Sequence, residues 1–451
     1  MTAQLSRRRF LATSAIATGA AIGAGTLLDS GLTPRVQAAQ DRSAITLTAM
    51  YNPNELTNQQ IKTFEQQHPG ITVNRILPNP VRLSAMLAAG QPPDFIRAVS
   101  TDIPSFAARG VALNLDPYFS RSKVLTSANL LPSNDSFRWD GAVQGKGPRY
   151  GMAKDFSLDS QMWFNKTLFD RVGVTYPRTT TPLDYNELLT LAKKLTVRKG
   201  SSISVYGLDI GWDLQWPIYG QIVWMLAQEG KSLWNHDYTE ADFTSPEARK
   251  VLKWFVDWAQ ARVGSSPLDP GSTWGGGLFE ANRAAMIMYG YWFEGEVLLD
   301  LPPLFPHMDF LPSPQWGNKR SSANFLTTGA IIPQGSPNKD AAWTFFEYFF
   351  AGQPASDRAR SGFGVPTLKS YLKDVPLETA QKKAVYRVFQ DDLAHATVLQ
   401  FSPYITQVGM STALTRYLEP IMRGQVTLDA GAQQLEAAVN KQLRLGKQQA
   451  G

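Results

Sequence analysis

The sequence predicts an α/β protein with at least two lobes. Near the N-terminus, strand-like and helix-like segments alternate, which is the order of a parallel sheet with right-handed crossovers. The length of 451 residues exceeds what one hydrophobic core usually serves. Hydrophobic residues make up 43% of the chain and charged residues 18%, which is typical of a globular protein with a rather neutral surface.

The first 38 residues have the pattern of an export signal. Residues 6–11 (SRRRFL) resemble the twin-arginine motif, and an apolar run rich in Ala, Gly and Thr follows. Residues 36–38 (VQA) fit the small-x-small rule, so we expect cleavage before Ala39. The alternative is a retained anchor, because about 20 apolar residues can span a bilayer. The glycines and threonines of the run favour cleavage, and we expect a periplasmic mature protein.

Charge and cysteine content exclude several classes of function. Residues 1–38 hold four Arg against one Asp, so they carry +3 of the formal charge of +6 and leave +3 for the rest. This charge is too small and too dispersed to predict nucleic-acid binding. The absence of Cys excludes disulfides, thiolate metal sites, Cys nucleophiles and a lipid-anchored N-terminal Cys.

The start of the mature chain predicts three strands separated by two helices. Residues 44–51 (AITLTAMY) form the first strand, and apolar residues at helical spacing then mark a helix that ends near residues 68–70 (HPG). A second strand begins at Ile71, a second helix is closed by Gly90, and a third strand contains Phe95 and Ile96.

Residues 149–173 predict a strand followed by a sharp turn into a helix. Residues 162–164 (MWF) form an apolar strand that stops at Asn165. The Asn side chain can accept a hydrogen bond from the free amides of a first helical turn, so we expect a short helix over residues 166–172. Gly173 is the expected left-handed residue that ends it. Three later helices are predicted to begin at Ser/Thr-Pro pairs, namely Thr181-Pro182, Ser245-Pro246 and Ser336-Pro337.

Enzyme signatures are incomplete. Residues 141–147 (GAVQGKG) superficially suggest a phosphate loop, but the spacing is one residue short and Gly147 stands where Ser or Thr must hold magnesium. We interpret this stretch as a turn. The four His lie far apart without ligand spacing, so we do not expect a metal site. Carboxylate pairs such as Asp155 and Asp159 could serve a glycosidase, but pairs arise by chance at this density of Asp and Glu.

An ordered set of motifs resembles the bacterial extracellular solute-binding proteins of family 1, the sugar receptors of ABC importers. Residues 90–95 (GQPPDF) are similar to the family's "G.PDv", and residues 163–173 to its "YNK.LF" segment, with Phe164 in place of Tyr and Ala153 in place of an upstream Pro. Residues 283–292 are similar to its "(r/k)AAM.i.g.W". The family's preceding Gly is Asn282 here, a residue that also tolerates positive φ. Residues 329–343 and 364–367 continue the resemblance.

This resemblance implies a type II periplasmic-binding-protein fold with a ligand cleft between two discontinuous lobes. We expect residues 39–154 and 304–350 in lobe one, and residues 155–303 and 351–451 in lobe two. The implied function is non-catalytic: a monomeric receptor captures a carbohydrate in the cleft and delivers it to the transmembrane permease subunits of an ABC transporter. No cofactor is implied.

A sugar site needs aromatic faces for C–H patches and polar side chains for hydroxyl groups. The polar candidates lie at strand ends, where open α/β sheets bind ligands, and at the expected crossings between lobes: Tyr51, Asn52, Asp94, Asp102, Asp155 and Asn324. The aromatic candidates lie in breaker-rich loops or match the family's cleft aromatic: Trp212, Trp216, Trp274 and Trp292. Core packing is the alternative for each Trp, and turn capping is the alternative for Asp94.

Two alternatives stay open at this point. The same fold could bind a polyol, glycerol phosphate, a polyamine or a chelated metal. A phosphate would require Arg or helix amides in the cleft, and a polyamine would require two or more carboxylates. The second alternative is a secreted carbohydrate-active enzyme, which would place two carboxylates about 5–10 Å apart around a bound sugar.

Overall fold

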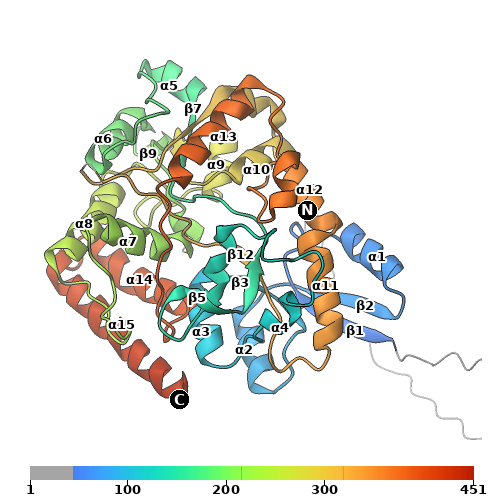
Figure 1. Ribbon diagram of the computed structural model, residues 1–451. Helices are drawn as coiled ribbons and strands as arrows, with labels where there is room; N and C mark the ends of the chain where they lie inside the picture. The colour runs from blue at the N-terminus through green and yellow to red at the C-terminus, as the bar shows by residue number, and fades with distance from the viewer. Residues whose placement is uncertain (1–43, 215, 318, 451) are drawn as a thin grey trace, which may run out of the picture. The chain divides into compact units, whose positions relative to one another are not determined.

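The computed structural model describes residues 44–214, 216–317 and 319–450, without the side chains of Leu214 and Trp216 (Figure 1). The expected export signal and its cleavage site lie outside the described residues, and they stay predictions. Among the described residues, no helix combines the length and the apolarity that crossing a membrane requires.

The first sheet has five strands in the order β2-β1-β3-β12-β6. Strand β1 (Ile45–Met50) pairs in parallel with β2 (Ile71–Ile76) and β3 (Phe95–Val99), as the alternation of strands and helices predicts. Strand β12 (Thr328–Ile331) returns much later in the chain and pairs antiparallel with both β3 and β6 (Gly151–Ala153).

Helices with aromatic faces cover this sheet. Helix α1 (Asn58–Gln67) begins at a capping box in which Thr57 and Gln60 exchange hydrogen bonds with each other's backbone. Its Phe64 packs edge-on against Phe345 of α11 (Lys339–Ala351), with 4.9 Å between ring centroids. Further elements of this part are α2 (Pro80–Ala88), α3 (Ile103–Ala108), α4 (Asp116–Phe119), β4 (Arg138–Trp139) and β5 (Gln144–Arg149).

The second sheet is built around the predicted strand and Asn turn. Strand β7 (Met162–Asn165) lies between β10 (Met286–Ile287) and β11 (Met308–Leu311), antiparallel to both. The Asn165 side chain accepts a hydrogen bond from the Leu168 amide at 3.3 Å and caps α5 (Lys166–Val172). Gly173 follows in the left-handed region with φ of 67°. This local prediction is confirmed, and so is positive φ at Asn282 (55°).

A large helical core adjoins the second sheet, and Figure 1 shows α14 and α15 beside α7 and α8. The helices and short strands of this part are α6 (Tyr185–Leu195), β8 (Val197–Lys199), β9 (Ser202–Val205), α7 (Trp216–Gln228), α8 (Pro246–Gln260), α9 (Gly275–Glu280), α10 (Phe293–Asp300), α12 (Gln353–Ser361), α13 (Ala380–Leu393), α14 (Gln407–Met422) and α15 (Leu428–Ala450).

Some local predictions are wrong. Helix α6 starts at an Asp184 capping box with Glu187, three residues beyond the predicted Thr181 cap. The Asp184 side chain accepts hydrogen bonds from backbone amides of the first turn, and the Glu187 side chain accepts one from the Asp184 amide. Helix α11 starts at Lys339 and not at Ser336, whose hydroxyl instead donates to Asp94. Ser245 does cap α8. The stretch interpreted as a turn contains the start of β5, which pairs with β4.

Two segments, residues 154–161 and 312–327, connect strands of the two sheets, and residues 362–368 run beside them between α12 and α13. We call all three the crossing segments. They bond to one another: Phe156 and Val365 exchange backbone hydrogen bonds of 2.7 and 2.8 Å, and the Ser160 amide donates to the Ala323 carbonyl at 3.1 Å. Strand β11 pairs with β7 in the second sheet, although the expected lobe one included residues 304–350. The chain therefore returns to the first sheet only at β12; the other lobe boundaries stay predictions.

Candidate functional site

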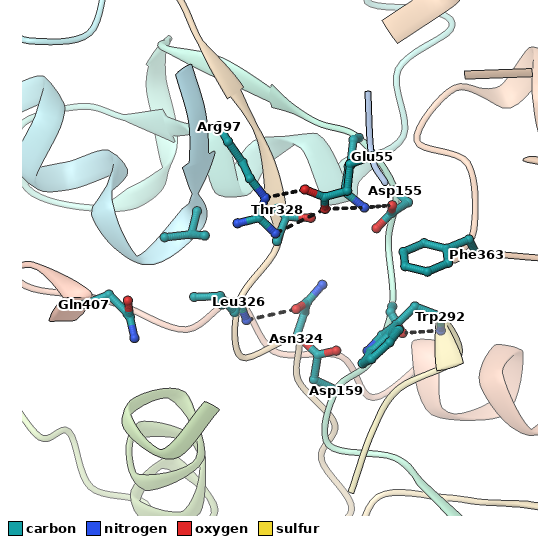
Figure 2. A pocket seen from close by; sticks show the side chains of 13 residues that line it. Glu55, Arg97, Asp155, Asp159, Trp292, Asn324, Leu326, Thr328, Phe363 and Gln407 are labelled. Carbon is teal, nitrogen blue, oxygen red and sulfur yellow. Dashed lines mark hydrogen bonds and ion pairs between the residues drawn. The ribbon is translucent and has the colours of Figure 1, made fainter. Parts of the chain in front are cut away.

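A cavity of about 280 Å³ lies where the crossing segments meet the two sheets (Figure 2). The loop after β1, strand β3, all three crossing segments, the loop before α10 and the start of α14 contribute to its wall. The lining residues are Glu55, Arg97, Val99, Lys154, Asp155, Ser157, Asp159, Trp292, Asn324, Leu326, Thr328, Phe363 and Gln407.

The first crossing segment presents alternate residues to this cavity. Lys154 and Asp155 both line it where the segment begins. From Asp155 onward the lining residues alternate: Ser157 and Asp159 line the cavity, whereas Phe156 pairs through its backbone with Val365. Successive side chains of an extended chain point to opposite faces, so every second residue reaches the same side. An extended crossing segment thus delivers two carboxylates and a hydroxyl to one wall.

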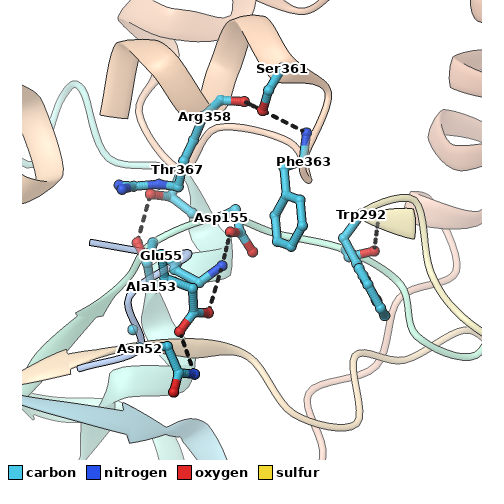
Figure 3. A network of polar contacts seen from close by, with 12 residues as sticks. Asn52, Glu55, Ala153, Asp155, Trp292, Arg358, Ser361, Phe363 and Thr367 are labelled. Carbon is cyan, nitrogen blue, oxygen red and sulfur yellow. Dashed lines mark hydrogen bonds and ion pairs between the residues drawn. The ribbon is translucent and has the colours of Figure 1, made fainter. Parts of the chain in front are cut away.

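A charged network occupies one end of the cavity (Figures 2 and 3). The Arg97 guanidinium donates to Glu55 through Nε at 2.5 Å and Nη2 at 3.2 Å. Lys154 Nζ lies 3.3 Å from Glu55 Oε1 and also pairs with Asp155. Asn52 Nδ2 donates to Glu55 Oε2 at 2.9 Å from behind. Both cations of the cavity wall are therefore engaged with protein carboxylates.

The electrostatics of Glu55 follow from this network. Burial raises the pKa of its carboxyl, but the charges of Lys154 and Arg97 outweigh burial and lower the pKa to about 2. Glu55 is thus ionised at any physiological pH. An anionic ligand such as a phosphate would have to compete with this carboxylate for the same two cations.

Aromatic rings line the cavity next to this network, and Lys154 Nζ lies 5.0 Å from the centroid of the Phe363 ring. The backbone amide of Trp292 donates to Ser157 Oγ at 3.1 Å, which ties the Trp to the first crossing segment. The Trp292 ring lies 5.8 Å from Phe363 and 5.1 Å from Tyr289, measured between centroids. Figure 2 shows Trp292 and Phe363 close together on the same side of the cavity. Both rings are only partly buried, so they offer apolar faces to a ligand.

Asp159 lies beside these rings without a cation. Burial raises the pKa of its carboxyl to about 7; backbone amides of Leu326 and Phe325 and the Trp292 side chain favour the charged form, whereas Asp155 disfavours it. A carboxyl group near neutrality can either accept or donate a hydrogen bond to a hydroxyl group. Asn324, whose Oδ1 accepts from the Leu326 amide at 3.0 Å, adds an amide nearby.

The structure brings some of the predicted site residues together and leaves others elsewhere. Asp155, Trp292 and Asn324 line the cavity. Asn52 stands one layer behind, where it supports Glu55. Tyr51 is fully buried in the core of the first sheet, 5.0 Å from the Phe349 ring, and it does not reach the cavity wall.

The two remaining Asp candidates hold the backbone in place. Asp94 accepts hydrogen bonds from the Thr48 amide at 2.8 Å, Ser336 Oγ at 2.6 Å and Asn338 Nδ2 at 3.2 Å, which is the turn-capping role weighed as its alternative. Asp102 accepts from the Gln407 amide at 2.7 Å and so positions the start of α14. Burial raises the pKa of Asp102 to about 6, although the Gln407 amide favours the charged form.

The other Trp candidates do not line the cavity, as far as they are described. Trp212 is buried in the helical core. Trp274 stacks on Tyr289, with ring centroids 5.9 Å apart and planes 20° apart. The side chain of Trp216 lies outside the described part of the structure. Trp212 therefore has the core-packing role that was its alternative. Trp274 packs on Tyr289, which in turn contacts Trp292 of the cavity wall.

Sequence reasoning missed Glu55, Arg97, Asp159 and Gln407 as lining residues. Arg97 could have been recognised as a site candidate, because it is a charged residue inside the otherwise apolar strand at residues 95–99 (FIRAV). Nothing in the local sequence marks Gln407, since it reaches the cavity from a helix more than three hundred residues beyond Arg97. Among the described residues, His, Asp and Glu side chains do not gather in groups of three that could hold a metal ion.

Solved structures with this fold come from several bacteria. An ABC substrate-binding protein from Listeria monocytogenes, in complex with cycloalternan, has a TM-score of 0.71 at 23% identity over 88% of this chain and 98% of its own. An ABC transporter solute-binding protein from Thermotoga lettingae, bound with alpha-D-tagatose, has a TM-score of 0.70 at 23% identity over 88% and 99%. A maltose/maltodextrin-binding domain from Bdellovibrio bacteriovorus, bound to maltotriose, has a TM-score of 0.68 at 17% identity over 89% and 99%.

At these low identities the likeness establishes the fold, and it confirms the expected type II periplasmic-binding-protein architecture. No curated protein matches the sequence. A model of the bacterial extracellular solute-binding proteins matches residues 50–351, which is most of the chain. The chain therefore belongs to the bacterial extracellular solute-binding protein family.

Proposed function

We propose that this protein is the substrate-binding receptor of an ABC importer and that it captures a carbohydrate in the 280 Å³ cavity. The observation that carries the proposal is the pairing of a partly exposed aromatic face, Trp292, with a carboxyl group that has no cation beside it, Asp159, and an amide, Asn324. An aromatic face covers the C–H patches of a sugar ring, and carboxyl and amide groups bond to its hydroxyl groups. The carbohydrates in the three similar structures support the same ligand class.

The charge distribution argues for an uncharged ligand. The two cations of the cavity wall, Arg97 and Lys154, are paired with Glu55 and Asp155, so a phosphate meets no free cation there. A polyamine would need at least two free carboxylates, and of the three carboxyl groups in the wall only Asp159 stands apart from Lys and Arg. Asp155, Trp292 and Asn324 are the contacts we propose among the residues predicted from the sequence.

Capture would work by domain closure and not by chemistry. A ligand that touches both lobes only in the closed form shifts the open–closed equilibrium by its differential affinity. The closed form would then dock on the transmembrane permease subunits. In this proposal the protein is a non-catalytic monomer that acts in the periplasm after export and cleavage of its twin-arginine signal.

A thermal-shift screen of residues 39–451 tests the ligand class. The panel comprises maltotriose, mannobiose, tagatose and cycloalternan, with sorbitol, glycerol 3-phosphate and spermidine as rivals. A ligand at 100 times its Kd adds about 2.7 kcal/mol to the free energy of unfolding, a clear melting shift. We expect a shift with a carbohydrate and none with spermidine or glycerol 3-phosphate. A shift with only those two compounds, or hydrolysis of a bound glycoside, would refute the proposal.

A further inference from the structure

A second, larger cavity of about 500 Å³ lies against the crossing segments. Its wall includes Phe156 and Leu158 of the first crossing segment and Val365 of the third. Phe389 of α13 and Leu399, from the chain between α13 and α14, line it as well. The volume falls within the range of about 300–1,000 Å³ that is usual for small-molecule sites.

The two cavities lie on either side of the first crossing segment, and Asn324 lines both of them. Along the first crossing segment, Asp155, Ser157 and Asp159 line the first cavity, whereas Phe156 and Leu158 line the second. The end of the second crossing segment and the start of β12 repeat this pattern, since Leu326 and Thr328 line the first cavity and Thr327 between them lines the second. The alternation of an extended chain thus separates a polar cavity from an apolar one.

The chemistry of the second cavity differs from that of the first. Among the described residues that line it, none is Asp, Glu, Lys, Arg or His. Leu393 and Val398, which are 43% and 52% exposed, stand among the lining residues at the protein surface. An uncharged wall with exposed aliphatic side chains favours an apolar ligand, because burial of apolar surface is the main gain on binding.

One buried acceptor in this wall stands without a donor. Gln144 is only 4% exposed, and its Nε2 donates to the carbonyl oxygens of Ser100 at 2.6 Å and Ser136 at 2.7 Å. These two bonds fix the orientation of the amide. Within the described part of the chain, its buried Oε1 has no hydrogen-bond partner. Leaving such an acceptor unsatisfied is unfavourable, so a ligand that donates a hydrogen bond would be preferred.

We propose that the second cavity is a binding site for an uncharged, mostly apolar small molecule that carries one hydrogen-bond donor. Such a ligand would fill the apolar wall and donate to Gln144 Oε1. This site is separate from the first cavity, although Asn324 lines both.

The neutral fluorophore N-phenyl-1-naphthylamine tests the proposal, because it is apolar and its amine N–H is a donor. We expect residues 39–451 to bind it at one saturable site with a blue shift of its emission. Its N-methyl derivative, which lacks the donor, should bind about fivefold more weakly. Emission that does not saturate would overturn the site, and equal binding of both compounds would overturn the role of Gln144.

Matched variants locate the site. Leu393→Glu and, separately, Val398→Glu place a carboxylate at the exposed edge of the cavity wall, and each should weaken fluorophore binding by about tenfold. Leu445→Glu is the control, since Leu445 of α15 is 50% exposed and does not line the cavity. Unchanged melting temperatures verify folding. If all three variants bind the fluorophore as the wild type does, the ligand lies elsewhere and the proposal fails.

Discussion

The Glu55→Gln substitution probes the charged network most directly, because it removes one charge and keeps the shape of the side chain. The Glu55 side chain is 9% exposed, that of Lys154 is 2% exposed and that of Arg97 is 22% exposed. The network lowers the pKa of Glu55 from 4.5 to about 2. This difference corresponds to about 3 kcal/mol of stability at neutral pH. It agrees with the cost of about 3–5 kcal/mol for removing one partner of a buried ion pair.

The expected loss is therefore about 3 kcal/mol, measured by urea denaturation at pH 7. Its pH dependence has a definite sign. A carboxyl group with a lowered pKa in the folded state stabilises the protein above its unfolded pKa of 4.5, and this contribution is lost as the pH falls toward about 2. The gap between wild type and Glu55→Gln should stay constant from pH 7 to about 5 and narrow below 4.5.

Asp257→Asn is the control, because Asp257 forms an exposed pair with Lys253 at 2.6 Å, in which the two side chains are 39% and 62% exposed. Exposed pairs contribute about 0.5 kcal/mol or less. If Glu55→Gln costs no more than this control, or if its effect at pH 3 equals that at pH 7, the network does not stabilise the fold as argued.

Three further predictions concern the binding wall and the Asn turn. Trp292→Ala should weaken carbohydrate binding by about 10- to 100-fold in calorimetry, because it removes the aromatic face; Trp139→Ala, outside the cavity wall, should leave it unchanged. Burial raises the pKa of Asp159 to about 7, so its contribution to the stability of the wild type falls as the pH rises from 3.8 through 7. The Asp159→Asn variant should therefore melt at a higher temperature than the wild type at pH 8, and the difference should be smaller at pH 5. A variant that melts below the wild type at pH 8 would contradict this. Asn165→Ala should cost about 1 kcal/mol in urea denaturation by removing the α5 cap, and no measurable loss would exclude the cap as a stabilising contact.

Local structure was predictable where a few neighbouring residues decide it. The Asn165 cap, the Gly173 ending and the parallel β1, β2 and β3 depend on side chains and breakers within a short stretch. The start of α11 was not predictable, because the Ser336 hydroxyl bonds to Asp94, which precedes it by more than two hundred residues.

The binding wall was only partly predictable for the same reason. Trp292 and Asp155 follow recognisable patterns, since one matches a family motif and the other stands at the first crossing. Glu55 becomes a network residue only when β3 and the first crossing segment bring Arg97 and Lys154 to it. A single sequence cannot show which carboxylate meets which cation across such separations.

By itself, the sequence determined the first three parallel strands with the helices between them, the Asn165 and Ser245 caps, and the family through its ordered motifs. Only the tertiary structure decided which side of each crossing segment faces which cavity and which charges neutralise one another. The physical reason is that alternation and capping act over a few residues. Burial and ion pairing instead depend on chain segments that meet only after the sheets have formed.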